Sequence, residues 1–160
     1  TMDSYRLAEK FNEEDQQACL VRVIKKLNAR FPGIKLILNR GFEIIPRVRD
    51  QIQMVAAESP FRGWNASAKR YIDLPPQDRE WLLGQLQTIS KRDKLPVMSI
   101  DYVPPHDREA MRETAKKIDE LGIIPWVTDA DLNTLGMGLV EAKARRVLIL
   151  HNGAEAPSLN

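Results

Sequence analysis

The feature that most constrains this chain is a regular alternation of short apolar segments with longer stretches of helical periodicity. The expected strands are residues 34–38, 52–57, 95–100 and 123–127, with a further candidate at 146–150. The expected helices are residues 12–31, 77–91 and the stretch from Pro104 to Gly122. Apolar strands that alternate with amphipathic helices predict an α/β fold with a parallel sheet.

The first expected helix carries the clearest signals. Asn12 is a suitable N-cap, and three acidic residues follow it where the helix dipole favours negative charge. Apolar side chains at steps of three and four residues form one apolar stripe, namely Leu20, Ile24, Leu27 and Phe31. Cys19 has apolar neighbours, so we expect its thiol to be buried and inert.

Composition narrows the possible functions. The net charge is +2 and the basic residues are dispersed among acidic ones, so no nucleic-acid surface is predicted. The single cysteine allows no internal disulfide, and His106 and His151 lack metal-ligand spacing, so neither metal nor cofactor is expected. No apolar stretch approaches the ~20 residues of a membrane span. The 160 residues also fall short of the ~250 of a complete (β/α)8 barrel.

Polar residues stand at the end of each of the first four expected strands. They are Asn39-Arg40, Glu58, Asp101-Tyr102 and Thr128-Asp129. The carboxyl ends of parallel strands share one edge of a sheet, and active sites of α/β folds gather there. The sequence therefore predicts a site at this edge.

Glu58 is the sharpest catalytic candidate, because it follows an apolar strand and would emerge at a partly desolvated rim. A desolvated carboxyl holds a proton more readily, as a general acid requires. The alternative is that Glu58 caps the following turn or pairs with Arg62. Asp101 has two possible roles as well, a structural one or contact with an arginine or a substrate hydroxyl. Arg40 could orient a carboxylate, bind a sugar or form an ion pair with Glu43.

Aromatic residues lie in or beside the expected loops, where their faces suit stacking on sugar rings. Trp64 and Tyr71 belong to a stretch over residues 61–71 that we expect to be one long loop. Tyr102 follows a strand. Trp126 lies inside an apolar strand, so a core position is the stronger alternative for that ring.

Several motifs, in this order, resemble glycoside hydrolase family 114, which contains endo-α-1,4-polygalactosaminidases. They are Asp3-Ser4-Tyr5, Leu38-Asn39-Arg40-Gly41-Phe42-Glu43, Ala57-Glu58-Ser59, Ile100-Asp101-Tyr102 and Pro125-Trp126-Val127. The resemblance covers nearly the whole chain and is greatest to hydrolase domains of exopolysaccharide systems.

The resemblance implies a (β/α)8 TIM barrel of which residues 1–152 would form the C-terminal half, about strands 5 to 8, followed by a tail or linker over residues 153–160. It implies that Glu58 is catalytic and that the partner aspartate lies immediately before Thr1. The residues expected to face substrate are Asp3, Asn39, Arg40, Glu43, Trp64, Tyr71, Asp101, Tyr102 and Trp126.

The function that the resemblance implies is endo-hydrolysis of α-1,4-linked galactosamine or N-acetylgalactosamine polysaccharide in the periplasm or outside the cell. We expect the isolated chain to be inactive, and to need the remaining barrel half upstream of Thr1 or to associate through exposed strand edges. The alternative function is a non-catalytic carbohydrate-binding or interaction domain with a smaller α/β fold.

Overall fold

The computed structural model describes residues 12–132, and the chain divides into two compact units. The first unit is Thr1–Ala56 with Gln85–Val97, and the second is Ala57–Gly84 with Met98–Asn160. The predicted strand at 146–150, the predicted tail at 153–160 and Asp3 lie outside the described residues.

Helix α1 (Glu13–Arg30) confirms the first expected helix to within one residue at each end. Asn12 caps it, because its Oδ1 accepts a hydrogen bond from the Glu14 N–H at 2.9 Å. The buried residues are Val21 and Ile24. The prediction for Cys19 is wrong, since this residue is exposed. Steps of two and five residues along a helix place Cys19 on the side away from Val21 and Ile24.

Strands β1 (Ile37–Asn39) and β2 (Met54–Glu58) pair in parallel in the first unit, with Leu38 opposite Val55. Both begin later than the apolar pattern predicted. The chain between them forms three short helical turns, which are η2 (Phe42–Ile44), α2 (Ile45–Val48) and η3 (Arg49–Gln51). Their apolar side chains fill the space beside α1, and the Asn28 amide donates to the Gln51 carbonyl at 3.0 Å.

Strands β5 (Val97–Tyr102) and β6 (Ile124–Thr128) pair in parallel, with Tyr102 opposite Thr128. In the second unit the Ser59 N–H donates to the Ile100 carbonyl at 2.6 Å, so β2 ends beside β5. These parallel pairs confirm the predicted α/β class. Residues 12–132 contain no closed barrel.

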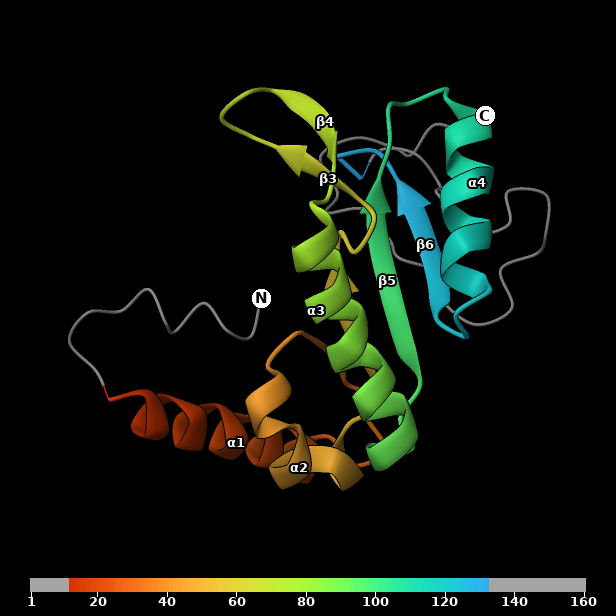
Figure 1. Cartoon of the computed structure of the whole chain (residues 1–160). Helices are drawn as coiled ribbons and strands as arrows, with labels where there is room; N and C mark the ends of the chain where they lie inside the picture. The colour runs from red at the N-terminus through yellow and green to blue at the C-terminus, as the bar shows by residue number, and fades with distance from the viewer. Residues whose placement is uncertain (1–11, 133–160) are drawn as a thin grey trace. The chain divides into compact units, whose positions relative to one another are not determined.

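Helix α4 (Arg108–Asp119) lies along β6 (Figure 1) and buries Met111, Ala115 and Ile118. It begins later than predicted, because Asp107 rather than the proline pair is its N-cap and accepts a hydrogen bond from the Ala110 N–H at 3.0 Å. Helix α3 (Pro76–Thr88) starts in the second unit and continues as one π-helical turn, η4 (Ile89–Asp93).

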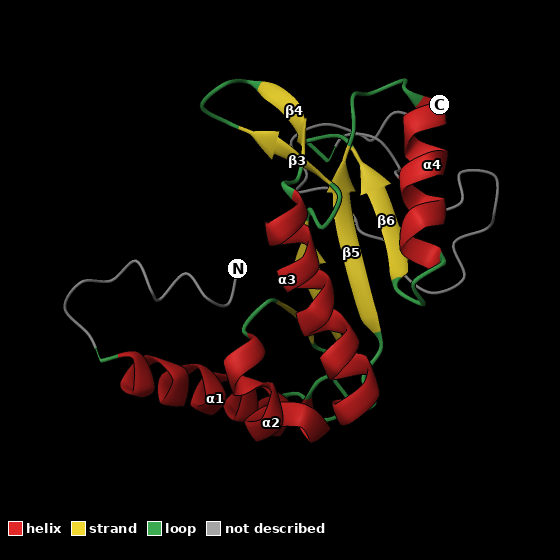
Figure 2. Ribbon diagram, in the orientation of Figure 1, coloured by secondary structure: helices red, strands yellow, loops and turns green. Residues whose placement is uncertain are grey.

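The expected long loop over residues 61–71 is instead largely a β-hairpin. Strands β3 (Arg62–Asn65) and β4 (Arg70–Asp73) pair antiparallel and are drawn as two yellow arrows (Figure 2). Asn65 Oδ1 accepts from the Ala68 N–H at 2.8 Å within the turn. These strands have four residues each and no clear alternation of apolar side chains, so periodicity could not predict them.

Candidate active site

Glu58 is the last residue of β2 and is half-buried. The Tyr102 hydroxyl, at the end of β5, donates a hydrogen bond to Glu58 Oε2 at 3.1 Å. Burial raises the pKa of the Tyr102 hydroxyl, and the nearby charge of Glu58 and the hydrogen bond to it raise it further. Tyr102 therefore stays protonated and remains a donor to Glu58 throughout the ordinary pH range.

The chain leaves β2 abruptly after Glu58. Ser59 has a φ of +59°, in the left-handed region that non-glycine residues rarely occupy. The next glycine, Gly63, comes so close that an added Cβ would lie 3.3 Å from the Ser59 Cβ. Backbone strain of this kind concentrates at functional sites, where the surrounding structure holds it in place.

Asp101 is fully buried, and protein groups occupy its carboxylate. Oδ1 accepts hydrogen bonds from the backbone N–H groups of Phe61 at 2.8 Å and Arg62 at 2.6 Å, and Oδ2 accepts one from the Ser99 hydroxyl. Side chains alternate between the faces of a strand, so Asp101 and Tyr102 point to opposite faces of β5. The structure thus brings Glu58 together with Tyr102 and not with Asp101, which anchors the segment that follows Glu58.

The pKa of Asp101 is raised above its ordinary value of 3.8, because burial outweighs the hydrogen bonds and the charge of Arg79, which act in the opposite direction. A carboxyl whose pKa is higher in the folded state contributes stability that is complete below the unfolded pKa and is lost as pH rises through the folded pKa.

We therefore expect the stability advantage of the parent chain over Asp101→Asn to shrink as pH rises above 3.8, the ordinary pKa of an aspartate. Asparagine keeps the shape of the side chain but does not titrate. Urea unfolding of both proteins at a series of pH values measures the difference. A difference that grows with pH would show that the carboxyl favours its charged form in the folded chain.

The hairpin places two of the predicted aromatic residues side by side. The rings of Trp64 and Tyr71 pack edge to face with centroids 4.9 Å apart, and Trp64 is 38% exposed. The Tyr71 hydroxyl accepts from the Ala130 N–H at 3.3 Å, which ties the hairpin to the segment after β6. Burial raises the pKa of Tyr71, and the charges of Asp129 and Asp131 add to that shift. Trp64 is thus the exposed ring of this pair, and Tyr71 packs against it.

The other residues that were expected to face substrate lie on different elements of the fold. Trp126 is 3% exposed, so the structure favours the core alternative for its ring. Asn39 ends β1 in the first unit, and Arg40 follows with a φ of +61°. Glu43 is an exposed residue of η2.

Sequence reasoning missed three sets of contacts around Asp101 and the segment that follows Glu58. Arg62 Nε forms an ion pair with Asp73 Oδ1 at 3.3 Å across the hairpin, and the Arg79 guanidinium lies 5.2 Å from the centre of the Phe61 ring. Neither pair has a local sequence signal. The third, Ser99, could have been found, because a polar residue two positions before Asp101 shares its face of the strand.

Within residues 12–132, no group of histidine, cysteine, aspartate or glutamate side chains could hold a metal ion. No helix among those residues is both long and apolar enough to cross a membrane.

A parallel α/β unit with a half-buried glutamate at the carboxyl end of a strand is typical of the barrel class of hydrolases, whose active sites lie at that end of the strands. The comparisons identify the family within this class. The chain belongs to glycoside hydrolase family GH114, whose sequence pattern matches residues 1–144. A search of curated proteins found no match.

Two solved structures are similar to this chain. One is the glycoside hydrolase domain of PelA from Pseudomonas aeruginosa, with 36% sequence identity and a TM-score of 0.81. The other is a variant of that domain in which one glutamate is replaced by alanine, with 35% identity and the same TM-score. Each match covers 88% of this chain and 55% of the solved chain. The present chain thus spans little more than half the length of these relatives.

Proposed function

We propose that this chain forms part of an endo-acting glycoside hydrolase that cleaves α-1,4-linked galactosamine or N-acetylgalactosamine polymers, with Glu58 as the acid/base. The observation that carries the proposal is the position of Glu58, half-buried at the carboxyl end of β2 and held by the Tyr102 hydroxyl at 3.1 Å. Membership of family GH114 supports the reaction class.

The reaction needs two carboxyl groups. One protonates the leaving glycosidic oxygen, and the other attacks the sugar or activates water, as an oxocarbenium-like transition state develops. We propose that Glu58 is the first and that an aspartate immediately before Thr1 is the second. The solved relatives, of which this chain covers 55%, support a larger domain. This chain joined to that proposed preceding half is called the complete domain.

The test is release of oligosaccharides from partly acetylated polygalactosamine by the complete domain and by the 160-residue chain alone. We expect products only from the complete domain, and none from a β-1,4-linked glucosamine polymer. Release of products by the chain alone would show that the assignment of the second carboxylate is wrong. Retention of the polymer without cleavage by the complete domain would favour the alternative, a carbohydrate-binding domain.

Substrate contact is proposed for Trp64, because its ring is partly exposed on the hairpin and can serve as a stacking surface. Asp101 is assigned a positioning role instead, since protein groups occupy its carboxylate. We also propose a periplasmic or extracellular location, which rests on the likeness to PelA.

Tyr102 is proposed as a positioning residue for Glu58. Tyr102→Phe keeps the ring and removes the only donor that it offers to Glu58, so we expect kcat of the complete domain to fall about tenfold, the effect of losing about 1.4 kcal/mol. KM for the polymer should change less than twofold. Steady-state kinetics over a range of pH measure both, and an unchanged kcat would remove Tyr102 from the site.

Exposed strand edges favour association of the 160-residue chain with itself. In the described residues β1 pairs only with β2, and β6 pairs only with β5. We expect the sedimentation coefficient of the chain to rise with protein concentration. A single monomeric species with a cooperative melt at all concentrations would contradict this proposal.

A further inference from the structure

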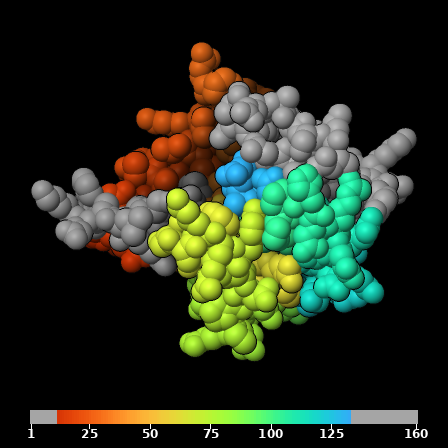
Figure 3. Space-filling view, turned by 90° about the horizontal axis from the view of Figure 1, so that it is seen from above, coloured from red at the N-terminus to blue at the C-terminus, as the bar shows by residue number. Residues whose placement is uncertain are grey.

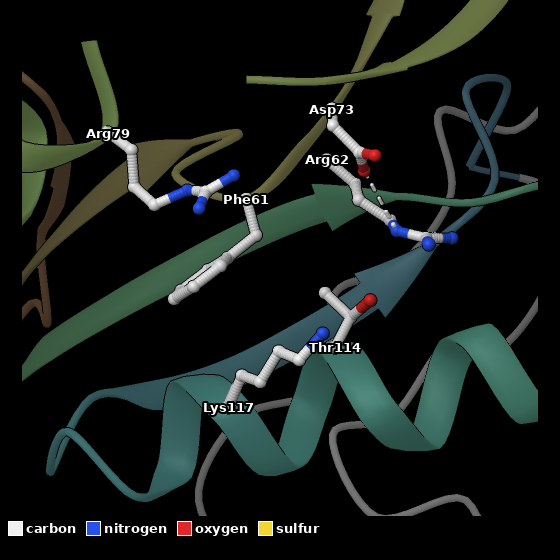
Figure 4. Close-up of a pocket in the computed structure, with 6 residues that line it drawn as sticks. All are labelled: Phe61, Arg62, Asp73, Arg79, Thr114 and Lys117. Carbon is white, nitrogen blue, oxygen red and sulfur yellow. Dashed lines mark ion pairs between the residues drawn. The ribbon is translucent and has the colours of Figure 1, made fainter. Parts of the chain in front are cut away.

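A small cavity of about 210 Å³ lies in the second unit (Figure 4), and Glu58 is not among the residues that line it. It is lined by Phe61, Arg62, Asp73, Arg79, Thr114 and Lys117. Three of these side chains are cations and one is a carboxylate, which leaves an excess of two positive charges around the space. The volume is below the ~300 Å³ at which drug-sized ligand sites begin, so any occupant is small.

Arg62 and Arg79 are held in place by protein contacts, but not all of their N–H donors are used in those contacts. Arg79 Nη2 donates to the Leu74 carbonyl at 3.1 Å, while its Nε is buried without a hydrogen-bond partner among the described residues. Arg62 uses its Nε for the ion pair with Asp73. A guanidinium has five N–H donors, so both side chains keep donors for a further acceptor. Buried donors that lack acceptors are costly, and a bound anion would satisfy them.

Helix α4 supplies the other wall of the cavity (Figure 4). Lys117 has no ion-pair partner within residues 12–132, and Thr114 adds a hydroxyl from a buried position. The neighbouring Lys116 is different, because it pairs with Glu120 at 3.9 Å and does not line the cavity. Viewed from above, the yellow and yellow-green atoms of the β2–α3 segment lie next to the teal atoms of α4 (Figure 3).

We propose that this cavity is a binding site for a small oxyanion, a phosphate or carboxylate group, held by Arg79, Lys117 and Arg62. Planar guanidinium groups match the oxygens of such anions in pairs, and the lysine adds a point charge. The site is separate from Glu58. Asp101 binds the backbone of Phe61 and Arg62 on the face of β5 opposite the Tyr102 side chain that holds Glu58.

Two of the residues that line the cavity also belong to the segment that follows Glu58, so a bound anion would contact that segment. Phe61 and Arg62 line the cavity with their side chains, and their N–H groups are bound to Asp101. The charge of Arg79 acts on the same carboxylate and lowers the pKa of Asp101, against the larger effect of burial. An anion beside Arg79 would offset that charge, so the Phe61 and Arg62 amides are the natural reporters of binding.

The test is a titration of the isotope-labelled chain with inorganic phosphate in one series and sodium acetate in another, with sodium chloride at matched ionic strength as the reference. We expect saturating shifts of the Phe61 and Arg62 amide signals with one or both oxyanions and not with chloride. The two series show whether phosphate or carboxylate is the preferred group. Shifts that stay linear and equal to those in chloride would overturn the proposal.

The matched variants are Lys117→Gln and Lys116→Gln, adjacent exposed lysines of α4. Loss of one charge-assisted contact should raise the dissociation constant for phosphate about tenfold in Lys117→Gln, and leave it unchanged in Lys116→Gln. Equal changes in the dissociation constant for the two variants would contradict the proposed oxyanion site. Equilibrium dialysis with labelled phosphate gives the same comparison on protein that associates. Glu58→Gln should leave phosphate binding intact, so this inference and the proposed hydrolysis fail or succeed separately.

Discussion

Replacing Glu58 by glutamine should reduce hydrolysis of polygalactosamine by the complete domain by about 10²–10⁴-fold, the usual contribution of a positioned general acid or base. Glutamine preserves the size of the side chain and can still accept the Tyr102 hydrogen bond, but it cannot deliver a proton. The loss should appear mainly in kcat. Initial rates of reducing-end formation measure it directly.

The matched control for this experiment is Glu80→Gln, which removes a carboxylate from an exposed position on α3. We expect its rate to stay within about twofold of the parent, since surface substitutions away from such features have small effects. A Glu58→Gln enzyme that keeps more than a tenth of the parent rate would show that another group donates the proton.

The largest effect on stability is expected at Asp101. Asp101→Ala leaves the Phe61 and Arg62 N–H groups and the Ser99 hydroxyl without their acceptor in a buried place. Each donor left unsatisfied costs about 1 kcal/mol or more, so the loss of three acceptor contacts should lower the free energy of unfolding by at least about 3 kcal/mol. This is a large share of the total stability of a typical domain. Urea unfolding followed by circular dichroism measures the loss.

Asp119→Ala is the control, because Asp119 is an exposed aspartate at the end of α4. Its effect should stay within about 0.5 kcal/mol. If Asp101→Ala costs less than 1 kcal/mol, Asp101 does not anchor the segment after Glu58.

The α/β class and the main helices could be predicted because periodicity and capping are local signals. Asn12 and Gly122 mark a helix start and a helix end that the structure contains. The hairpin could not be predicted, since its strands are short and the packing of Trp64 against Tyr71 joins residues of two different strands. The exposure of Cys19 was missed for a related reason, because local apolar composition does not show which helix face meets the core.

For the site, sequence position located Glu58 at a strand end, and the structure places Tyr102 beside it. The position of Asp101 relative to Glu58 depends on where strand β5 ends. Strand β5 extends through Asp101 and Tyr102, two residues beyond the predicted end, so these neighbours diverge to opposite faces instead of sharing a rim. The Arg62–Asp73 pair and the contact of Arg79 with Phe61 depend on tertiary folding and leave no local pattern.

Proton donation by Glu58 to a leaving sugar is tested most directly by comparing two substrates of the complete domain. A dinitrophenyl α-galactosaminide has a leaving group that needs no proton, whereas the polymer has one that does. We predict that Glu58→Gln lowers the rate on the polymer by about 10²–10⁴-fold and the rate of bond cleavage on the aryl glycoside by less than about tenfold. Equal losses on both substrates would contradict the assignment of Glu58 as the acid.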